Sequence, residues 1–184
     1  MTGDAAMADR PTVSIRFSAA EIAARVDEMA ADLAAKLPAD TLVVSVLKGS
    51  FVFAADLIRA LSRAGANWSM DFLTLSSYGT GTETSGNVRI VRDIVDDVRG
   101  RDVLLVDDIL ESGLTLSFAT NLLKERGARR VWVCTLLDKP HKRRAELTAD
   151  FVGFEAGDEF LVGYGLDWAH RFRGLPYIGV VEKD

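Results

Sequence analysis

The sequence predicts an α/β fold in which a largely parallel β-sheet is flanked by helices. Stretches typical of strands alternate along the chain with stretches of helical period, an order that generates right-handed βαβ crossovers. Residues 103–106 (V-L-L-V) form a continuous apolar run, typical of a strand buried on both faces in the middle of a parallel sheet. The chain has 184 residues, 48% hydrophobic and 27% charged, enough to bury such a sheet in one domain without disulfides.

The N-terminal part is expected to consist of an arm and one helix. Residues 1–12 are small and polar without a period, so we expect a disordered arm, followed by a single domain at residues 13–184. Ser18 and Glu21 have the spacing of a capping box, which marks the start of a helix. Apolar residues then recur at helical spacing up to Pro38 (Ile22, Val26, Met29 and Leu33).

Strands and helices follow in alternation, then a loop and an irregular tail. Strand patterns occur at residues 41–47, 68–75, 88–91, 103–106 and 130–137, and helical patterns at residues 51–62 and 115–126. Residues 76–87 hold three glycines and almost nothing to bury, so we expect a flexible lid loop. Residues 151–184 contain short strand-like pieces (151–154, 159–163 and 177–181), which we expect to fold over the sheet edge as a hood.

Charge and composition exclude several classes of protein. The net charge of −5 argues against a nucleic-acid partner, and the one basic cluster, residues 139–144, fits a solvated helix start except for Lys139. No apolar run approaches the ~20 residues of a membrane span, and the N-terminus does not resemble a signal peptide, so we expect a soluble cytoplasmic protein. Cys134 is expected to be a buried thiol, and His141 and His170 lack the partners that a zinc site needs.

One segment carries the groups that bind a sugar phosphate. Asp107 and Asp108 follow the apolar strand, at the edge where α/β folds bind ligands, and two carboxylates can accept hydrogen bonds from neighbouring sugar hydroxyls. Ser112, Gly113 and Thr115 then precede a helical stretch. Small residues at a helix start leave N–H groups free, and the helix dipole favours an anion such as a phosphate monoester. Between the two groups, Glu111 is the natural candidate for proton transfer.

This segment resembles the 5-phosphoribosyl 1-pyrophosphate (PRPP) motif of type I phosphoribosyltransferases: strand, two acids, two apolar residues, acid, Ser, Gly, x, Thr. Further stretches are similar to the hypoxanthine-guanine phosphoribosyltransferases, namely V-L-K-G-S at 46–50, L-S-S-Y-G at 75–79, L-L-D-K at 136–139 and most of 151–173. The similarity extends from about residue 41 to the C-terminus. It implies the type I fold, with a parallel core, a small hood and a flexible lid.

The resemblance implies a purine salvage enzyme that transfers the phosphoribosyl group of PRPP to hypoxanthine or guanine with the help of Mg²⁺. Lys48, Gly49 and Arg173 correspond to the family's pyrophosphate-binding residues, and the peptide before that lysine can be cis. Ser77 and Tyr78 correspond to the tip of the family's lid, which closes over the reacting atoms and also contacts pyrophosphate.

The same resemblance assigns the purine and metal sites. Lys139 corresponds to the lysine that binds the exocyclic oxygen of a 6-oxopurine and so disfavours adenine. Phe160 corresponds to the aromatic residue that stacks on the base, and Leu161 to the residue whose backbone recognises the purine edge. Asp167 lies on the purine and metal side, and Asp107 is the second expected Mg²⁺ ligand. The family also implies a homodimer or homotetramer.

Two departures from the family pattern leave alternatives open. The family usually has Glu-Asp where this chain has Asp107 and Asp108, and Asp where this chain has Glu111. The first side chain of the ribose-binding pair is therefore one methylene shorter than in the family, and the side chain of the proposed base is one methylene longer. The sugar-phosphate motif does not encode the base, so xanthine or uracil as substrate stays open, as does the choice between hypoxanthine and guanine. A regulator of the same fold that binds RNA and senses nucleotides is the alternative from another class, since such proteins can carry Asp-Asp here.

Overall fold

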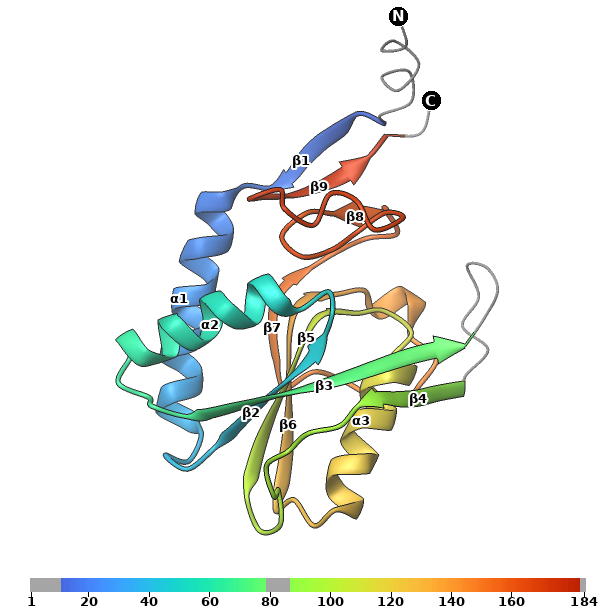
Figure 1. Cartoon of the computed structure of the whole chain (residues 1–184). Coiled ribbons are helices and arrows are strands. Elements are labelled where there is room, and N and C mark those ends of the chain that lie inside the picture. Colours follow the sequence, from blue (N-terminus) through green and yellow to red (C-terminus); the bar gives the residue numbers. More distant parts are fainter. Residues whose placement is uncertain (1–10, 79–86, 183–184) are drawn as a thin grey trace, which may run out of the picture.

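The computed structural model describes residues 11–78 and 87–182. Within these residues the main sheet has six strands in the order β4-β3-β2-β5-β6-β7 (Figure 1). All neighbouring strands are parallel except β3 and β4, which are antiparallel, so the predicted fold class is confirmed. The strands are β2 (Leu42–Leu47), β3 (Ser69–Tyr78), β4 (Asn87–Arg92), β5 (Asp102–Leu110), β6 (Arg130–Asp138) and β7 (Phe151–Glu155).

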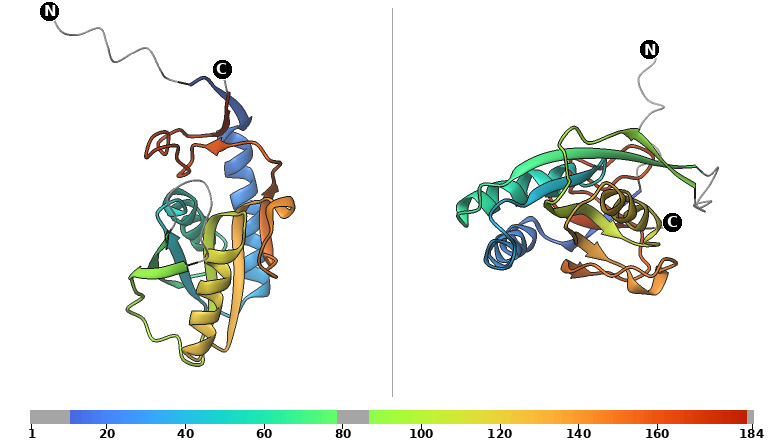
Figure 2. Two further views of the ribbon diagram at one scale, coloured as in Figure 1. Left: turned by 90° about the vertical axis from the view of Figure 1, so that its right-hand side faces the viewer. Right: turned by 90° about the horizontal axis from the view of Figure 1, so that it is seen from below.

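Helices cover both faces of this sheet. α1 (Ala19–Lys36) and α2 (Phe51–Arg63) lie on one face and α3 (Leu114–Glu125) on the other (Figure 2). In β5, Leu104 and Val106 belong to the apolar cluster with α1 and α2, whereas Val103 and Leu105 belong to the cluster with α3. Because both faces are buried, every position of the V-L-L-V run is apolar. No helix in the described part of the chain is long and apolar enough to cross a membrane.

The predicted helix starts and stops agree closely with the structure. The Ser18 side chain accepts a hydrogen bond from the Glu21 N–H, and the Glu21 carboxylate accepts one from the Ser18 N–H, which confirms the capping box. α2 and α3 each end within one residue of the predicted boundary. β5 is longer than predicted and includes Asp107 and Asp108, which therefore sit in the second half of the strand rather than after it.

A second, three-stranded antiparallel sheet lies at one end of the molecule, in the order β1-β9-β8 (Figure 1). Its strands are β1 (Val13–Phe17), β8 (Leu161–Val162) and β9 (Ile178–Val181); with the segment 163–177 it is called the hood below. β1 was not predicted, although Val13, Ile15 and Phe17 alternate with polar residues. The expectation that 151–154 belong to the hood was wrong, because these residues pair in parallel with β6 as the edge strand β7.

The predicted lid loop is shorter than expected at its start. Residues 76–78 belong to β3, where Ser77 pairs with Val88 and Tyr78 with Asn87 of β4. Backbone pairing thus extends a β-ribbon into a stretch whose composition suggested a loop. The remaining loop residues, 79–86, lie outside the described residues.

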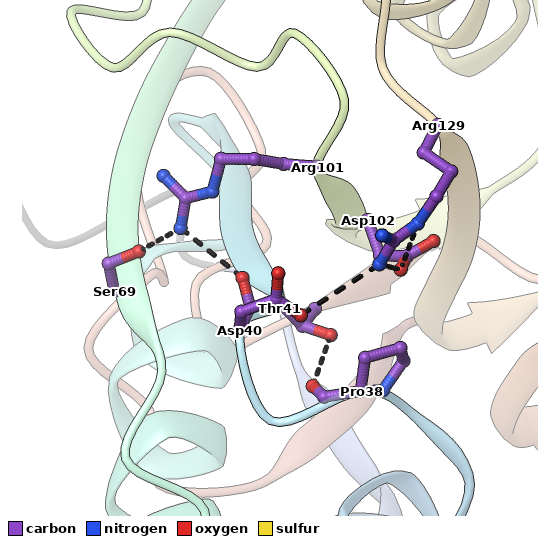
Figure 3. A network of polar contacts seen from close by, with 7 residues as sticks. All are labelled: Pro38, Asp40, Thr41, Ser69, Arg101, Asp102 and Arg129. Carbon is purple, nitrogen blue, oxygen red and sulfur yellow. Dashed lines mark hydrogen bonds and ion pairs between the residues drawn. The ribbon is translucent and has the colours of Figure 1, made fainter.

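At the end of the main sheet where its parallel strands begin, a polar network joins neighbouring strands (Figure 3). Arg129 donates to the carboxylate of Asp102, whose side chain is only 6% exposed. Arg101 donates to the Ser69 hydroxyl over 2.7 Å and to the carbonyl oxygen of Asp40. These contacts hold the starts of the strands together at the edge far from the cavities described next.

Candidate active site

Two neighbouring cavities lie at the carboxyl ends of β5 and β6. The larger, of about 530 Å³, lies between the end of β5, the turn after β6 and the hood. The smaller, of about 220 Å³, is formed by the segment from Asp107 to Leu116. Most of the predicted site residues line one or both cavities (Gly49, Asp107, Asp108, Glu111, Ser112, Gly113, Thr115, Lys139, Phe160, Leu161, Asp167 and Arg173). Sequence positions more than 100 residues apart are thus brought to one edge of the sheet.

The acidic pair at the end of β5 is buried and electrostatically unfavourable by itself. Asp107 and Asp108 are 8% and 9% exposed. Burial raises the pKa of Asp107 well above its ordinary value, and the neighbouring Asp108 carboxylate raises it further. Burial also raises the pKa of Asp108. Adjacent buried carboxylates of this kind are stabilised by a cation or by hydroxyl donors, so the pair is suited to ribose hydroxyls and a metal ion.

Gly49 makes room for one of these carboxylates. A Cβ placed on Gly49 would lie 1.8 Å from Oδ2 of Asp108, so no side chain fits there while the carboxylate keeps its position. The peptide bond between Leu47 and Lys48, just before this glycine, is cis, as the resemblance implied. Lys48 itself lines neither of the two cavities.

The loop that follows β5 has the form of a phosphate cradle. Gly113 caps α3 with φ at 79°, a left-handed conformation that glycine adopts without strain. Within the described residues, the N–H groups of Ser112 and Gly113 donate to no protein atom. The smaller cavity lies against these groups and the Thr115 side chain, at the positive end of the helix dipole.

Glu111 lines both cavities and is the one acidic side chain between the carboxylate pair and the phosphate cradle. Its side chain is 43% exposed, and its carboxylate lies 3.2 Å from Nζ of Lys142. It can therefore reach a ligand that spans the two cavities, and it remains the candidate for proton transfer.

The far wall of the larger cavity holds a cation and an aromatic ring. Lys139 is 4% exposed, and its Nζ donates to the carbonyl oxygen of Glu159 over 2.7 Å. Burial lowers the pKa of Lys139. Phe160 is 50% exposed and lines the cavity, so its ring is accessible for stacking, whereas Leu161 is buried. A donor beside an accessible aromatic ring is the arrangement that a planar oxygen-bearing heterocycle requires.

The hood contributes Asp167 and Arg173. Arg173 forms an ion pair of 2.6 Å with Asp167 and donates to the carbonyl oxygen of Gly165. Gly165 packs so closely on the Gly49 turn that a Cβ there would lie 2.1 Å from the carbonyl oxygen of Gly49. Sequence reasoning missed this contact because the two glycines are distant in sequence and neither carries a side chain that marks it.

The basic cluster at 139–144 does not form a solvated helix start. It is a short 3-10 turn, η1 (Pro140–Lys142), followed by Arg143, whose guanidinium forms an ion pair with Asp138. Lys142 lines the larger cavity. The expectation of a solvated surface was therefore wrong for Arg143, whose side chain is 16% exposed, whereas the side chain of Lys142 is 38% exposed. The only sequence signal for their place at the site was their position just after Lys139. His141 and His170 are exposed.

Mg²⁺ fits the donor set without a dedicated protein cage. Among residues 11–78 and 87–182, no group of three or more His, Cys, Asp and Glu side chains is arranged to hold a metal. Mg²⁺ is commonly held by one or two carboxylates, with waters and substrate oxygens completing the octahedron. The buried pair Asp107 and Asp108, whose pKa values are raised by burial, provides such carboxylates. Asp167, 26% exposed in the hood, can supply another.

Comparisons with known proteins agree with this geometry. The family model described as the phosphoribosyl transferase domain matches residues 18–168. The chain is 47% identical to a hypoxanthine-guanine phosphoribosyltransferase of Bacillus subtilis (strain 168) over 170 residues, 91% of this chain and 92% of the relative. It is 43% identical to a hypoxanthine phosphoribosyltransferase of Escherichia coli (strain K12) over 173 residues, 92% of this chain and 96% of the relative.

Solved structures give the same result. A hypoxanthine-guanine phosphoribosyltransferase from Bacillus anthracis superposes with a TM-score of 0.87 at 41% identity, covering 94% of this chain and 100% of that structure. A hypoxanthine phosphoribosyltransferase from Staphylococcus aureus superposes with a TM-score of 0.86 at 39% identity, covering 92% and 91%.

Proposed function

The chain belongs to the hypoxanthine-guanine phosphoribosyltransferases of the phosphoribosyl transferase domain family, and we propose that it transfers the 5-phosphoribosyl group of PRPP to hypoxanthine, guanine or both. In this reaction the bond between the anomeric carbon and pyrophosphate breaks, and a ring nitrogen of the purine bonds to that carbon. The purine loses a proton, and the products are a nucleoside monophosphate and pyrophosphate. The observation that carries the proposal is a pair of adjoining cavities that share Asp108, Ile109 and Glu111, with a buried carboxylate pair, a phosphate cradle and a buried lysine on their walls.

Each group in the site has a role in this reaction. The carboxylates of Asp107 and Asp108 accept hydrogen bonds from the ribose hydroxyls. The 5-phosphate binds the N–H groups of Ser112 and Gly113 and the Thr115 hydroxyl. These contacts hold the anomeric carbon between the two cavities, where positioning lowers the barrier.

The purine binds in the larger cavity. Lys139 donates to the exocyclic oxygen, Phe160 stacks on the ring, and the backbone of Leu161 recognises its edge. Adenine presents a donor where Lys139 requires an acceptor, so it binds poorly. Glu111 accepts the proton that the base loses.

Pyrophosphate binds on the hood side. Lys48, the N–H of Gly49 and Arg173 bind its oxygens, and the β3–β4 ribbon that carries Ser77 and Tyr78 covers it. The cationic groups stabilise the negative charge that develops on the leaving group. The ribbon excludes water from the sugar while its anomeric carbon carries positive charge.

Asp107 and Asp167 would hold Mg²⁺, with the carboxylate of Asp108 beside them. The ion would supply positive charge that offsets the charge of pyrophosphate and of the buried carboxylates. The same family membership supports a homodimer or homotetramer, which light scattering after gel filtration tests directly.

The test is nucleotide formation from PRPP and Mg²⁺ with five bases: hypoxanthine, guanine, xanthine, adenine and uracil. We expect turnover of hypoxanthine or guanine and none of adenine. Turnover restricted to xanthine or uracil would move the enzyme to another specificity. No turnover with any base, together with binding of RNA, would favour the regulatory alternative.

A further inference from the structure

We propose that Arg143, outside the set of residues assigned to the ligands above, is a positioning residue that orients the peptide groups of Glu111 and the phosphate cradle; the inference rests on the proposed function. Its guanidinium donates to the carbonyl oxygen of Glu111 over 2.8 Å. A second nitrogen of the same guanidinium pairs with the carboxylate of Asp138. One nitrogen of the guanidinium is thereby bound to Asp138 of β6, and another holds the backbone of the loop after β5.

The ion pair is rigid enough for this role. The side chains of Arg143 and Asp138 are 16% and 19% exposed, so both are largely shielded from water. A planar guanidinium that engages two acceptors at once has its orientation defined by both. Its aliphatic part packs on Gly113, where a Cβ would lie 3.1 Å from Cδ of Arg143.

The orientation of the Glu111 carbonyl group determines the direction in which the N–H groups of the phosphate cradle point. In a trans peptide the carbonyl and the next N–H point to opposite sides, so holding the Glu111 carbonyl directs the Ser112 N–H away from Arg143. The next peptide is held in the same way, because the Ser112 carbonyl accepts from the N–H groups of Arg144 and Ala145 over 2.9 and 3.0 Å. The Gly113 N–H is therefore also directed away from the segment 143–145.

The same short segment also holds the side chain of Glu111. Lys142 lies 3.2 Å from its carboxylate, while Arg143 holds its backbone. Lys139, at the start of this segment, donates its N–H to the Leu110 carbonyl over 2.9 Å. The segment that follows β6 thus connects the purine-binding lysine to the proton-transfer group and to the phosphate cradle.

The test is a double-mutant cycle between Arg143 and Glu111, measured as kcat with a saturating purine and PRPP. Arg143→Met keeps the aliphatic packing on Gly113 and removes the guanidinium. We expect it to lower kcat about tenfold or more and to raise the KM for PRPP, because both the base and the cradle lose their orientation. In a Glu111→Ala background the same substitution should change kcat less than about twofold, since two groups that act as one unit are not additive.

A matched control separates positioning from stability. Arg129 forms an ion pair with the buried Asp102 at the opposite edge of the sheet (Figure 3), so Arg129→Met removes an arginine–aspartate ion pair far from the site. Both variants should lose thermal stability, but only Arg143→Met should lose kcat. Arg143→Lys should recover part of kcat, because an ammonium can reach one of the two acceptors but cannot hold both in a plane. If Arg143→Met does not fold, Arg143→Lys takes its place in the cycle.

The outcomes distinguish this inference from the proposed function. If Glu111→Ala lowers kcat but the Arg143 loss is fully additive with it, or absent, Arg143 is not a positioning residue. An equal kcat loss in Arg129→Met would also overturn the inference, because stability alone would explain it. If the wild-type protein turned over no purine, the proposed function would fail, and this inference with it.

Discussion

Gly49 offers the sharpest test of how the site is built, because a side chain at this position would occupy the space of the Asp108 carboxylate. In Gly49→Ala the new Cβ would lie 1.8 Å from Oδ2 and 2.6 Å from Cγ of Asp108. Real Cβ contacts stay beyond 3.0 Å, so the carboxylate must retreat by about 1.2 Å or the turn must move. The Gly165 backbone, which packs on the carbonyl group of Gly49, limits movement of the turn.

The displacement predicts a loss of both function and stability. A shift of about 1 Å in a substrate-positioning group can reduce catalysis on the order of 100-fold. Overpacking at a close contact costs about 1–3 kcal/mol of unfolding free energy. We therefore expect kcat/KM for PRPP, measured with saturating purine, to fall about 100-fold in Gly49→Ala, with a lower Tm.

Gly174→Ala is the matched control. It is also in an ordinary backbone conformation, but a Cβ there meets nothing within 4 Å. It should retain wild-type kcat/KM. If Gly49→Ala were also within about twofold of the wild-type enzyme, the Asp108 carboxylate would not need its present position, and the assignment of this residue to the ribose would be refuted.

Three further predictions concern single groups of the site. Glu111→Ala should lower kcat with little change in PRPP affinity, because its role is proton transfer; an unchanged kcat, measured in steady state, would contradict that role. Lys139→Ala should lower kcat/KM for hypoxanthine about 10- to 100-fold, the value of a charge-assisted hydrogen bond, while adenine should stay without turnover in both the wild-type protein and the variant. The pKa of Asp107 is raised in the folded chain, so its protonation favours folding below the unfolded carboxyl pKa of about 3.9, and this contribution is lost as the pH rises through the raised folded value. Asp107→Asn should therefore have a higher Tm than the metal-free wild-type protein at pH 7 and an equal Tm near pH 3; equal melting at both pH values would show that the pair is not strained.

The parts of the site that lie close together in sequence were predictable. The strand, the carboxylate pair, Glu111 and the cradle all fall between residues 103 and 116, so their order alone places them along one edge. The capping box of α1 was predictable for the same reason, since Ser18 and Glu21 contact each other across one helical turn. Hydrogen-bond geometry and side-chain periodicity act over such short distances whatever the rest of the chain does.

Other residues were placed by resemblance rather than by pattern. Phe160 and Leu161 have no local feature that separates a base-binding pair from a core pair. The structure distinguishes them by exposure, because Phe160 lines the cavity at 50% exposed while Leu161 is buried. The exposure of a side chain depends on which distant segments pack against it, and the residues adjacent to it in the sequence do not determine this.

The tertiary structure alone decided the contacts between distant segments. β1 pairs with β9 from the far end of the chain, β7 joins the main sheet instead of the hood, and Arg143 turns from an expected surface charge into a link between β6 and the loop after β5. The space between Gly49 and Asp108 is likewise a property of two strands in register, β2 and β5. The sequence by itself therefore determined the chemistry that one short segment can carry, and packing between distant segments decided which other groups surround it, because burial and register depend on the whole chain.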